Sequence, residues 1–143
     1  MCLITDGKRV LVANGDSMKS ATRPIVPSHF YRVLGGSLNF GEKVGDGVRR
    51  EIREELGSEI EDLVKLDVIE NHFTYAGERG HEIVFLFKGK LARKELEEQE
   101  IVHIIEDTYE FDAVWVPISE LLTGAMPLYP ALDYKKYSIE EPR

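Results

Sequence analysis

Apolar residues recur at every fourth position between residues 44 and 56, and this spacing predicts an amphipathic helix. The four positions are Val44, Val48, Ile52 and Leu56. On a helix with 3.6 residues per turn they form one slowly drifting stripe that can be buried. Gly57 follows at once and is typical of a helix end, because glycine adopts a positive φ without a steric penalty.

Short apolar runs bounded by turn residues predict strands before and after this helix. We expect a hairpin over 1–13 with its turn at Asp6-Gly7, and strands over 30–34, 66–75, 82–91 and 111–116. The run 83–87 is apolar on both faces and therefore predicts a central strand.

The segments between these elements are less regular. Residues 14–28 contain Pro24 and Pro27, which remove backbone donors and predict a long loop. The charged segment 92–100 predicts either a short helix or a mobile loop. A short helix is expected over 119–122, and the proline-containing tail is expected to be loosely ordered with one helical turn.

Length and composition are those of one globular domain. The chain has 143 residues, 43% of them hydrophobic and 31% charged, and domains commonly contain about 100–150 residues. These values exclude the disordered, collagen-like and disulfide-rich classes. With no internal repeat or linker in the sequence, we expect residues 1–143 to form a single domain.

The net charge of −8 argues against a general nucleic-acid binder, because such proteins cluster Lys and Arg to displace counterions. The acidity is concentrated in two segments, with −4 over 36–62 and −8 over 95–112, while the rest of the chain carries +4. The basic remainder can still meet a small polyanionic substrate.

Cysteine and histidine usage favours a reducing compartment and gives no local metal motif. Cys2 is alone and has no partner for a disulfide, and no zinc-type spacing occurs. The histidines are expected to be surface or core residues, with metal binding the weaker alternative, because they lie far apart in sequence. They are His29, His72, His81 and His103. No signal peptide or apolar run of about 18 residues is present, so we expect a cytoplasmic protein that does not enter a membrane.

Three carboxylates lie on the polar face of the predicted helix. Glu51, Glu54 and Glu55 are three and four residues apart and project together. Like charges at this spacing destabilise a helix unless a cation neutralises them, and carboxylate oxygens are the ligands that Mg²⁺ and Mn²⁺ prefer. The alternative is a solvated acidic face, as charge runs usually are.

The surrounding residues resemble the signature box of the Nudix hydrolases. The run has Gly36, then Glu42 six positions later, then Arg50-Glu51-Ile52-Arg53-Glu54-Glu55-Leu56-Gly57. It departs from the family pattern in two places: Ser58 replaces a large aliphatic residue, with Ile60 as a substitute anchor, and Leu34 stands where many members have proline.

The resemblance implies an α/β fold in which a mixed β-sheet is sandwiched between helices (α/β/α). It also implies hydrolysis of a phosphoanhydride bond in a nucleoside diphosphate linked to another group, with Mg²⁺ or Mn²⁺ as cofactor. By this resemblance Glu54 and Glu55 are metal ligands, joined by the backbone carbonyl of Gly35 or Gly36. Glu51 is a base or a further ligand, the alternative being a plain salt bridge.

The resemblance assigns supporting roles to further residues. Arg50 orients the catalytic carboxylates, and Glu42 steadies the loop or reaches a metal through water. Many members add a carboxylate from a later loop. Of the glutamates available here we favour Glu110 as a further metal ligand. The alternative for each of them is a solvated surface residue. The four available are Glu98, Glu100, Glu106 and Glu110.

Substrate contacts are the least determined part of the sequence. Arg32, just before the two glycines, is the best-placed cation for a diphosphate, followed by Lys8, Arg9 and Arg23. A base could stack on an aromatic side chain, although aromatic residues in strands are more often part of the core. The aromatic candidates are Tyr31, Phe73 and Tyr75.

Several functions stay open at this stage. ADP-ribose, sugar nucleotides, dinucleoside polyphosphates and nucleoside triphosphates are all compatible with the box. The rival from another class is a catalytically idle Nudix-like module that binds a nucleotide as a sensor, and a third is removal of pyrophosphate from RNA ends. The family also contains many dimers, so a homodimer is compatible with the sequence.

Overall fold

The computed structural model describes residues 1–20, 29–75, 77–106 and 109–139, and omits the side chains of residues 19, 20, 75 and 109. Its strands are β1 (Cys2–Thr5), β2 (Arg9–Asn14), β3 (Lys19–Ser20), β4 (Tyr31–Val33), β5 (Ile60–Tyr75), β6 (Glu78–Leu91), β7 (Ile101–Glu106), β8 (Tyr109–Pro117) and β9 (Leu128–Tyr129). Its helices are α1 (Val44–Leu56) and α2 (Ile118–Thr123), with short 3₁₀ segments η1 (Gly15–Ser17), η2 (Lys94–Glu98) and η3 (Tyr134–Tyr137).

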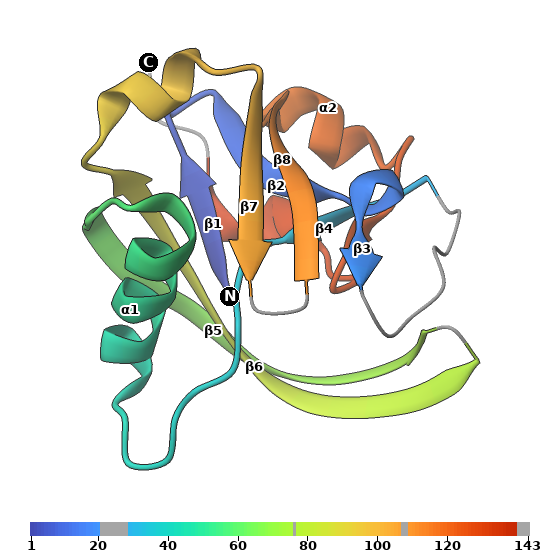
Figure 1. Cartoon of the computed structure of the whole chain (residues 1–143). Coiled ribbons are helices and arrows are strands. Elements are labelled where there is room, and N and C mark those ends of the chain that lie inside the picture. The colour runs from blue at the N-terminus through green and yellow to red at the C-terminus, as the bar shows by residue number, and fades with distance from the viewer. Residues whose placement is uncertain (21–28, 76, 107–108, 140–143) are drawn as a thin grey trace.

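The strands form one mixed sheet (Figure 1). Its main path runs β3-β8-β2-β1-β6-β5, with β7 beside β8. The first strand joins the two halves, because β1 pairs antiparallel with β2 and parallel with β6. One edge of β2 is shared: residues 10–11 pair with β1, and residues 12–14 pair with β4. The chain leaves β4 through Leu34, whose carbonyl accepts the N–H of Cys2 at 2.8 Å, and then enters the two glycines.

Alternating side chains of the sheet build two cores on its two faces. Leu11 and Ala13 of β2 belong to the core that α1 covers, whereas Val10 and Val12 belong to the core under α2 and the C-terminal segment. The sheet therefore lies between helical layers, and the expected α/β/α arrangement is confirmed. Within the described ranges, no helix is both long and apolar enough to span a membrane.

The helix follows the sequence pattern residue by residue. α1 begins at Val44 and ends at Leu56, and its stripe residues Val48, Ile52 and Leu56 are buried against the sheet. Gly57 has φ +60° and its N–H donates to the carbonyl of Arg53 at 2.9 Å, which closes the last turn. The polar face of α1 is thereby held at a fixed angle to the sheet.

The unusual Ser58 joins the helix end to a distant segment. Its side chain is buried, its hydroxyl donates to the Glu59 carbonyl at 2.8 Å, and its oxygen accepts the N–H of Arg93 at 3.0 Å. Ile60 is buried in the same core as α1 and supplies the apolar anchor that the serine lacks. The departure from the family pattern therefore leaves the helix exit well packed.

Several elements differ from the sequence prediction. β5 begins at Ile60, six residues earlier than expected, and β3, β7 and β9 were not predicted. In the charged segment 92–100 the short-helix alternative is correct, because η2 lies there, and the tail has its helical turn in η3. The expected loop over 14–28 contains the end of β2, η1 and β3, while Pro24 and Pro27 lie outside the described residues.

β5 and β6 extend beyond the rest of the sheet as a long curved hairpin (Figure 1). β1 pairs with β6 only at residues 87–89, whereas the β5–β6 ladder continues to the Tyr75–Glu78 pair. Two register shifts interrupt β5 near its start, between Glu61 and Val64 and between Lys65 and Asp67. We call the part of the hairpin from Ile69 to Val84 the distal hairpin.

Candidate active site

Two glycines bring the loop after β4 into contact with the body of the domain. A Cβ on Gly35 would lie 2.7 Å from the Met1 Cα, and a Cβ on Gly36 would lie 2.4 Å from the carboxyl carbon of Glu51. Cβ atoms do not approach other atoms so closely, so the Met1 backbone leaves no room for a side chain at 35, and a side chain at 36 would displace the Glu51 carboxylate. The backbone at 35–36 therefore lies directly beside the polar face of α1.

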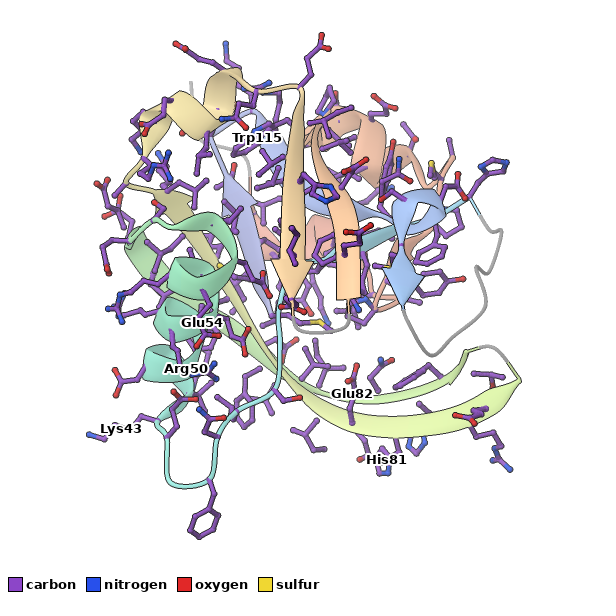
Figure 2. All side chains as sticks on the ribbon, viewed as in Figure 1. Lys43, Arg50, Glu54, His81, Glu82 and Trp115 are labelled. Atoms are coloured by element: carbon purple, nitrogen blue, oxygen red, sulfur yellow. The ribbon has the colours of Figure 1, made fainter. Side chains whose placement is uncertain are left out.

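The guanidinium of Arg50 organises this face (Figure 2). It donates to Glu42 through Nε and Nη2, at 2.8 and 3.0 Å, in a bidentate pair. The Nη1 group also donates to Glu51 at 3.1 Å and to Glu54 at 3.2 Å. Nη2 further donates to the carbonyl of Ser37 at 3.0 Å, which ties the loop to the helix.

Glu42 completes the tie between loop and helix. Its Oε1 also accepts the N–H of Asn39 at 3.1 Å. Hydrogen bonding from Arg50, followed by that of Asn39, lowers the pKa of the Glu42 carboxyl, and Glu42 in turn raises the pKa of Arg50. Both groups therefore stay ionised. Through its contact with Asn39, Glu42 holds the loop, which corresponds to the first of the two roles considered for it.

Three carboxylates converge beside this pair. Glu51 and Glu55 of α1 and Glu106 at the end of β7 each present an oxygen within 4.8 Å of the others. All three residues are half-buried, and Glu55 Oε1 is a buried atom with no hydrogen-bond partner among the described residues. A buried, unpaired carboxylate oxygen is costly. An oxygen-only, negatively charged donor set of this kind fits a hard divalent cation such as Mg²⁺ or Mn²⁺.

The strand periodicity explains why Glu106, and not Glu110, joins the helix carboxylates. Val102 and Ile104 of β7 point into the core under α1, and Glu106 follows on the same face of the strand. Glu110 instead lies 3.6 Å from Nε2 of the exposed His103. The sequence-based preference for Glu110 is thus not supported by its position, and Glu106 takes its place.

The other two acidic candidates lie at the far end of β7. Glu98 ends η2 and Glu100 precedes Ile101, which pairs with Val114, whereas Glu106 pairs with Tyr109 at the opposite end of the ladder. Neither carboxylate approaches the three that converge.

Glu54 occupies the rim of the cluster. Its side chain is 59% exposed and it is held by Arg50, so it does not point at Glu51, Glu55 and Glu106 in this arrangement. The expected ligand role for Glu54 requires its side chain to turn away from Arg50.

A cavity of about 290 Å³ lies beside the cluster. Gly36 and Leu38 of the loop, Glu51 and Glu55 of α1, and Glu82 of β6 contribute to its wall. A ligand in this cavity would lie against two of the three converging carboxylates and the glycine backbone at once.

The basic side chains considered for binding a diphosphate differ in their position. Arg32 lies on the sheet face under α1, over the Phe111 ring at 5.8 Å, and its Nε is buried without a partner. Arg9 pairs with Pro117, at the opposite end of β8 from the Tyr109–Glu106 pair, and is engaged by Asp6 at 2.7 Å. Arg32 does not line the cavity but lies on the same sheet face as the carboxylates, so it remains the candidate. Arg9 and its neighbour Lys8 do not, and Arg23 lies outside the described residues.

The aromatic residues considered for stacking on a base lie in different parts of the fold. Tyr31 packs in the core under α2, on the face opposite the carboxylates, and Phe73 is part of the distal hairpin. The side chain of Tyr75 is not among those described. Neither Tyr31 nor Phe73 lines the cavity.

Comparison with known proteins decides the family. The family model of the NUDIX domain matches residues 1–136. The chain belongs to the NUDIX family. The match covers the whole arrangement described above, from β1 through the helix carboxylates to η3, so the signature-box resemblance is confirmed.

Two solved structures are similar to this chain in fold, and one curated protein is similar in sequence. A NUDIX hydrolase from Nitrosomonas europaea superimposes with a TM-score of 0.57, at 21% identity, over 90% of this chain and 78% of that one. The ORF135 protein of E. coli gives a TM-score of 0.50 at 22% identity, over 91% of this chain and 78% of its own. Human mitochondrial NAD(P)H pyrophosphatase NUDT13 is 38% identical over 61 residues, which are 43% of this chain and 15% of that protein.

Arg50→Lys tests whether the Arg50 guanidinium orients the carboxylates of this NUDIX site. A lysine ammonium is a point charge and cannot hold Glu42 bidentately while also reaching Glu51 and Ser37. We expect Mn²⁺ affinity, measured from the electron paramagnetic resonance signal of free Mn²⁺, to fall about 10- to 100-fold. Arg49→Lys on the same helix is the matched control, and equal affinities in the two variants would refute the assignment.

Proposed function

We propose that this chain is a metal-dependent hydrolase of a phosphoanhydride bond in a nucleoside diphosphate linked to another group. The observation that carries the proposal is the convergence of Glu51, Glu55 and Glu106 beside Gly36, with one carboxylate oxygen left buried and unpaired. An oxygen-only site of this charge suits a divalent cation and, through it, a polyphosphate.

Each residue has a role that follows from its position. Glu55 holds the cation, together with a carbonyl of the Gly35-Gly36 backbone and with Glu54 once its side chain has turned, and Glu106 either holds the cation as well or accepts a proton from the attacking water. Glu51 is a further ligand or accepts a proton from the attacking water. The bound Mg²⁺ or Mn²⁺ would neutralise the charge that develops on the phosphoryl oxygens.

Two arginines are proposed to support the reaction, Arg50 on α1 and Arg32 on β4. Arg50 keeps Glu51 oriented while it neutralises part of the cluster's charge. Arg32 is proposed to bind the diphosphate, since its Nε is buried, partnerless and on the sheet face that carries Glu106.

The class of substrate is a small nucleotide derivative. ADP-ribose, sugar nucleotides, dinucleoside polyphosphates and nucleoside triphosphates are the candidates from the sequence, and the similarity to the NAD(P)H pyrophosphatase NUDT13 adds NAD(P)H to them. All share a phosphoanhydride that a cation held by carboxylates can bind.

A substrate panel tests the proposal directly. The chain is incubated with each candidate and with Mg²⁺ or Mn²⁺, and released nucleoside monophosphate or phosphate is measured. We expect at least one substrate to be cleaved only when a divalent cation is present, and chelation to abolish the release. No release from any compound, together with binding of one of them in a calorimetric titration, would instead favour the idle nucleotide-binding module.

A further inference from the structure

Two histidines that lie nine positions apart in sequence face each other on the distal hairpin. In the β5–β6 ladder His72 is the direct partner of His81. Their rings stack with centroids 4.0 Å apart and an angle of 13° between the planes. Both histidines lie on the surface, as the sequence predicts, but their separation along the chain did not indicate that they are neighbours, because a hairpin register brings together residues that spacing alone separates.

One carboxylate lies against both rings. Glu70 is two residues before His72 and so shares its face of β5. Its Oε1 is 3.0 Å from Nε2 of His72 and 3.1 Å from Nε2 of His81. The two imidazole nitrogens thus converge on a single oxygen, and the ligand atoms of all three residues lie within 4.8 Å of one another.

These separations are close to those of a metal's first coordination shell. With zinc–ligand distances near 2.1 Å, neighbouring ligand atoms of a tetrahedral ion are about 3.4 Å apart. The Glu70 oxygen needs to retreat from each nitrogen by only a few tenths of an ångström to admit an ion. Two imidazoles and a carboxylate are a donor set that zinc accepts, and the open side would be filled by water.

The cluster is separate from the proposed hydrolytic site in position and in chemistry. His81 lies on the side of the distal hairpin opposite Glu82, well away from Arg50 and Glu54 on α1 (Figure 2). The side chains of Glu70, His72 and His81 are 61%, 68% and 54% exposed, so an ion can reach them from solvent. The helix carboxylates offer oxygen only, which suits harder cations.

We propose that Glu70, His72 and His81 bind a divalent transition-metal ion of the zinc class. The ion cross-links β5 to β6 in a region where, in the described part of the chain, these two strands pair only with each other. The same β6 strand continues into the cavity wall through Glu82 and Phe85, so the ion stabilises the outer part of that wall.

Zinc titration in the presence of excess Mg²⁺ tests the site. The Mg²⁺ occupies the oxygen-only cluster, and long-range ¹H–¹⁵N spectra follow the histidine ring nitrogens while Zn²⁺ is added. We expect the Nε2 resonances of His72 and His81 to shift together and to saturate at one ion per chain. A chromophoric chelator gives the affinity, which His72→Gln or His81→Gln should each lower at least about tenfold.

His103→Gln is the matched control. His103 is also an exposed histidine beside carboxylates, with Nδ1 2.8 Å from Asp112 and Nε2 3.6 Å from Glu110, but the described structure gives it no second imidazole. Zinc affinity should stay unchanged in this variant. The proposal is overturned if zinc leaves the His72 and His81 resonances in place, or if affinity is the same in His72→Gln as in the unmodified chain. Either result would make the three residues a hydrogen-bonded cluster only.

Discussion

Glu55→Gln is expected to lower Mg²⁺-dependent hydrolysis by about 10²- to 10³-fold, because a preorganised charge at the reacting centre is removed. One oxygen of the Glu55 carboxylate is buried and has no hydrogen-bond partner in the described part of the chain. No hydrogen bond that stabilises the fold is therefore lost from this oxygen. Turnover of the substrate found by the panel, at saturating Mg²⁺, measures the loss.

Stability measurements separate this loss from misfolding. Without metal, the change removes one of three carboxylates that repel one another, so the urea midpoint of unfolding should stay the same or rise. Glu120→Gln on α2 is the control, since it removes an exposed glutamate from the opposite side of the sheet. Full activity in Glu55→Gln would contradict the proposed site.

Glu106→Gln and Glu110→Gln are expected to differ strongly although they lie four residues apart. Glu106 shares its strand face with the residues packed under α1, and its loss should reduce turnover by about 100-fold or more, whether it holds the cation or accepts a proton. Glu110 is 45% exposed beside His103, and its substitution should stay within about twofold.

The comparison is decided by steady-state rates of both variants at several Mg²⁺ concentrations. If Glu106 is a ligand, part of its defect is recovered at high Mg²⁺; if it is a base, the defect persists at saturation. Equal activity of the two variants would contradict the role proposed for Glu106. A larger defect in Glu110→Gln would support Glu110 as the additional carboxylate, as the sequence analysis favoured.

Local patterns predicted the elements that depend on a single segment of chain. The helix over 44–56 was predicted with its bounds because its stripe, its glycine end and its acidic face all lie within one stretch. The carboxylates at 51 and 55 and the glycine at 36 were singled out from the same segment, whereas the pairing of Arg50 with Glu42 was seen only in the structure.

The remaining site residues depend on contacts between distant segments. β7 was missed because apolar residues occupy both of its faces: Val102 and Ile104 are buried, but Ile101 and Ile105 are exposed. The sequence therefore lacks the alternation of apolar and polar residues that marks a half-buried strand. Without that strand, the side of the sheet on which Glu106 lies could not be assigned. The register of β5 against β6, which pairs His72 with His81, was equally hidden.

The two register shifts in β5 also limit how copies of this chain can associate. In the described part of the chain β5 forms one end of the main sheet path, and such an edge is a template for another strand. Here the shifts displace the backbone at Glu61–Val64 and Lys65–Asp67, and Asp62 adopts a positive φ of 53°. An incoming strand would lose ladder hydrogen bonds at both places and would meet a row of charges. This part of the edge is thus protected against open-ended strand addition, whereas the β5 ladder from Val68 to Tyr75 contains no register shift and keeps a regular edge.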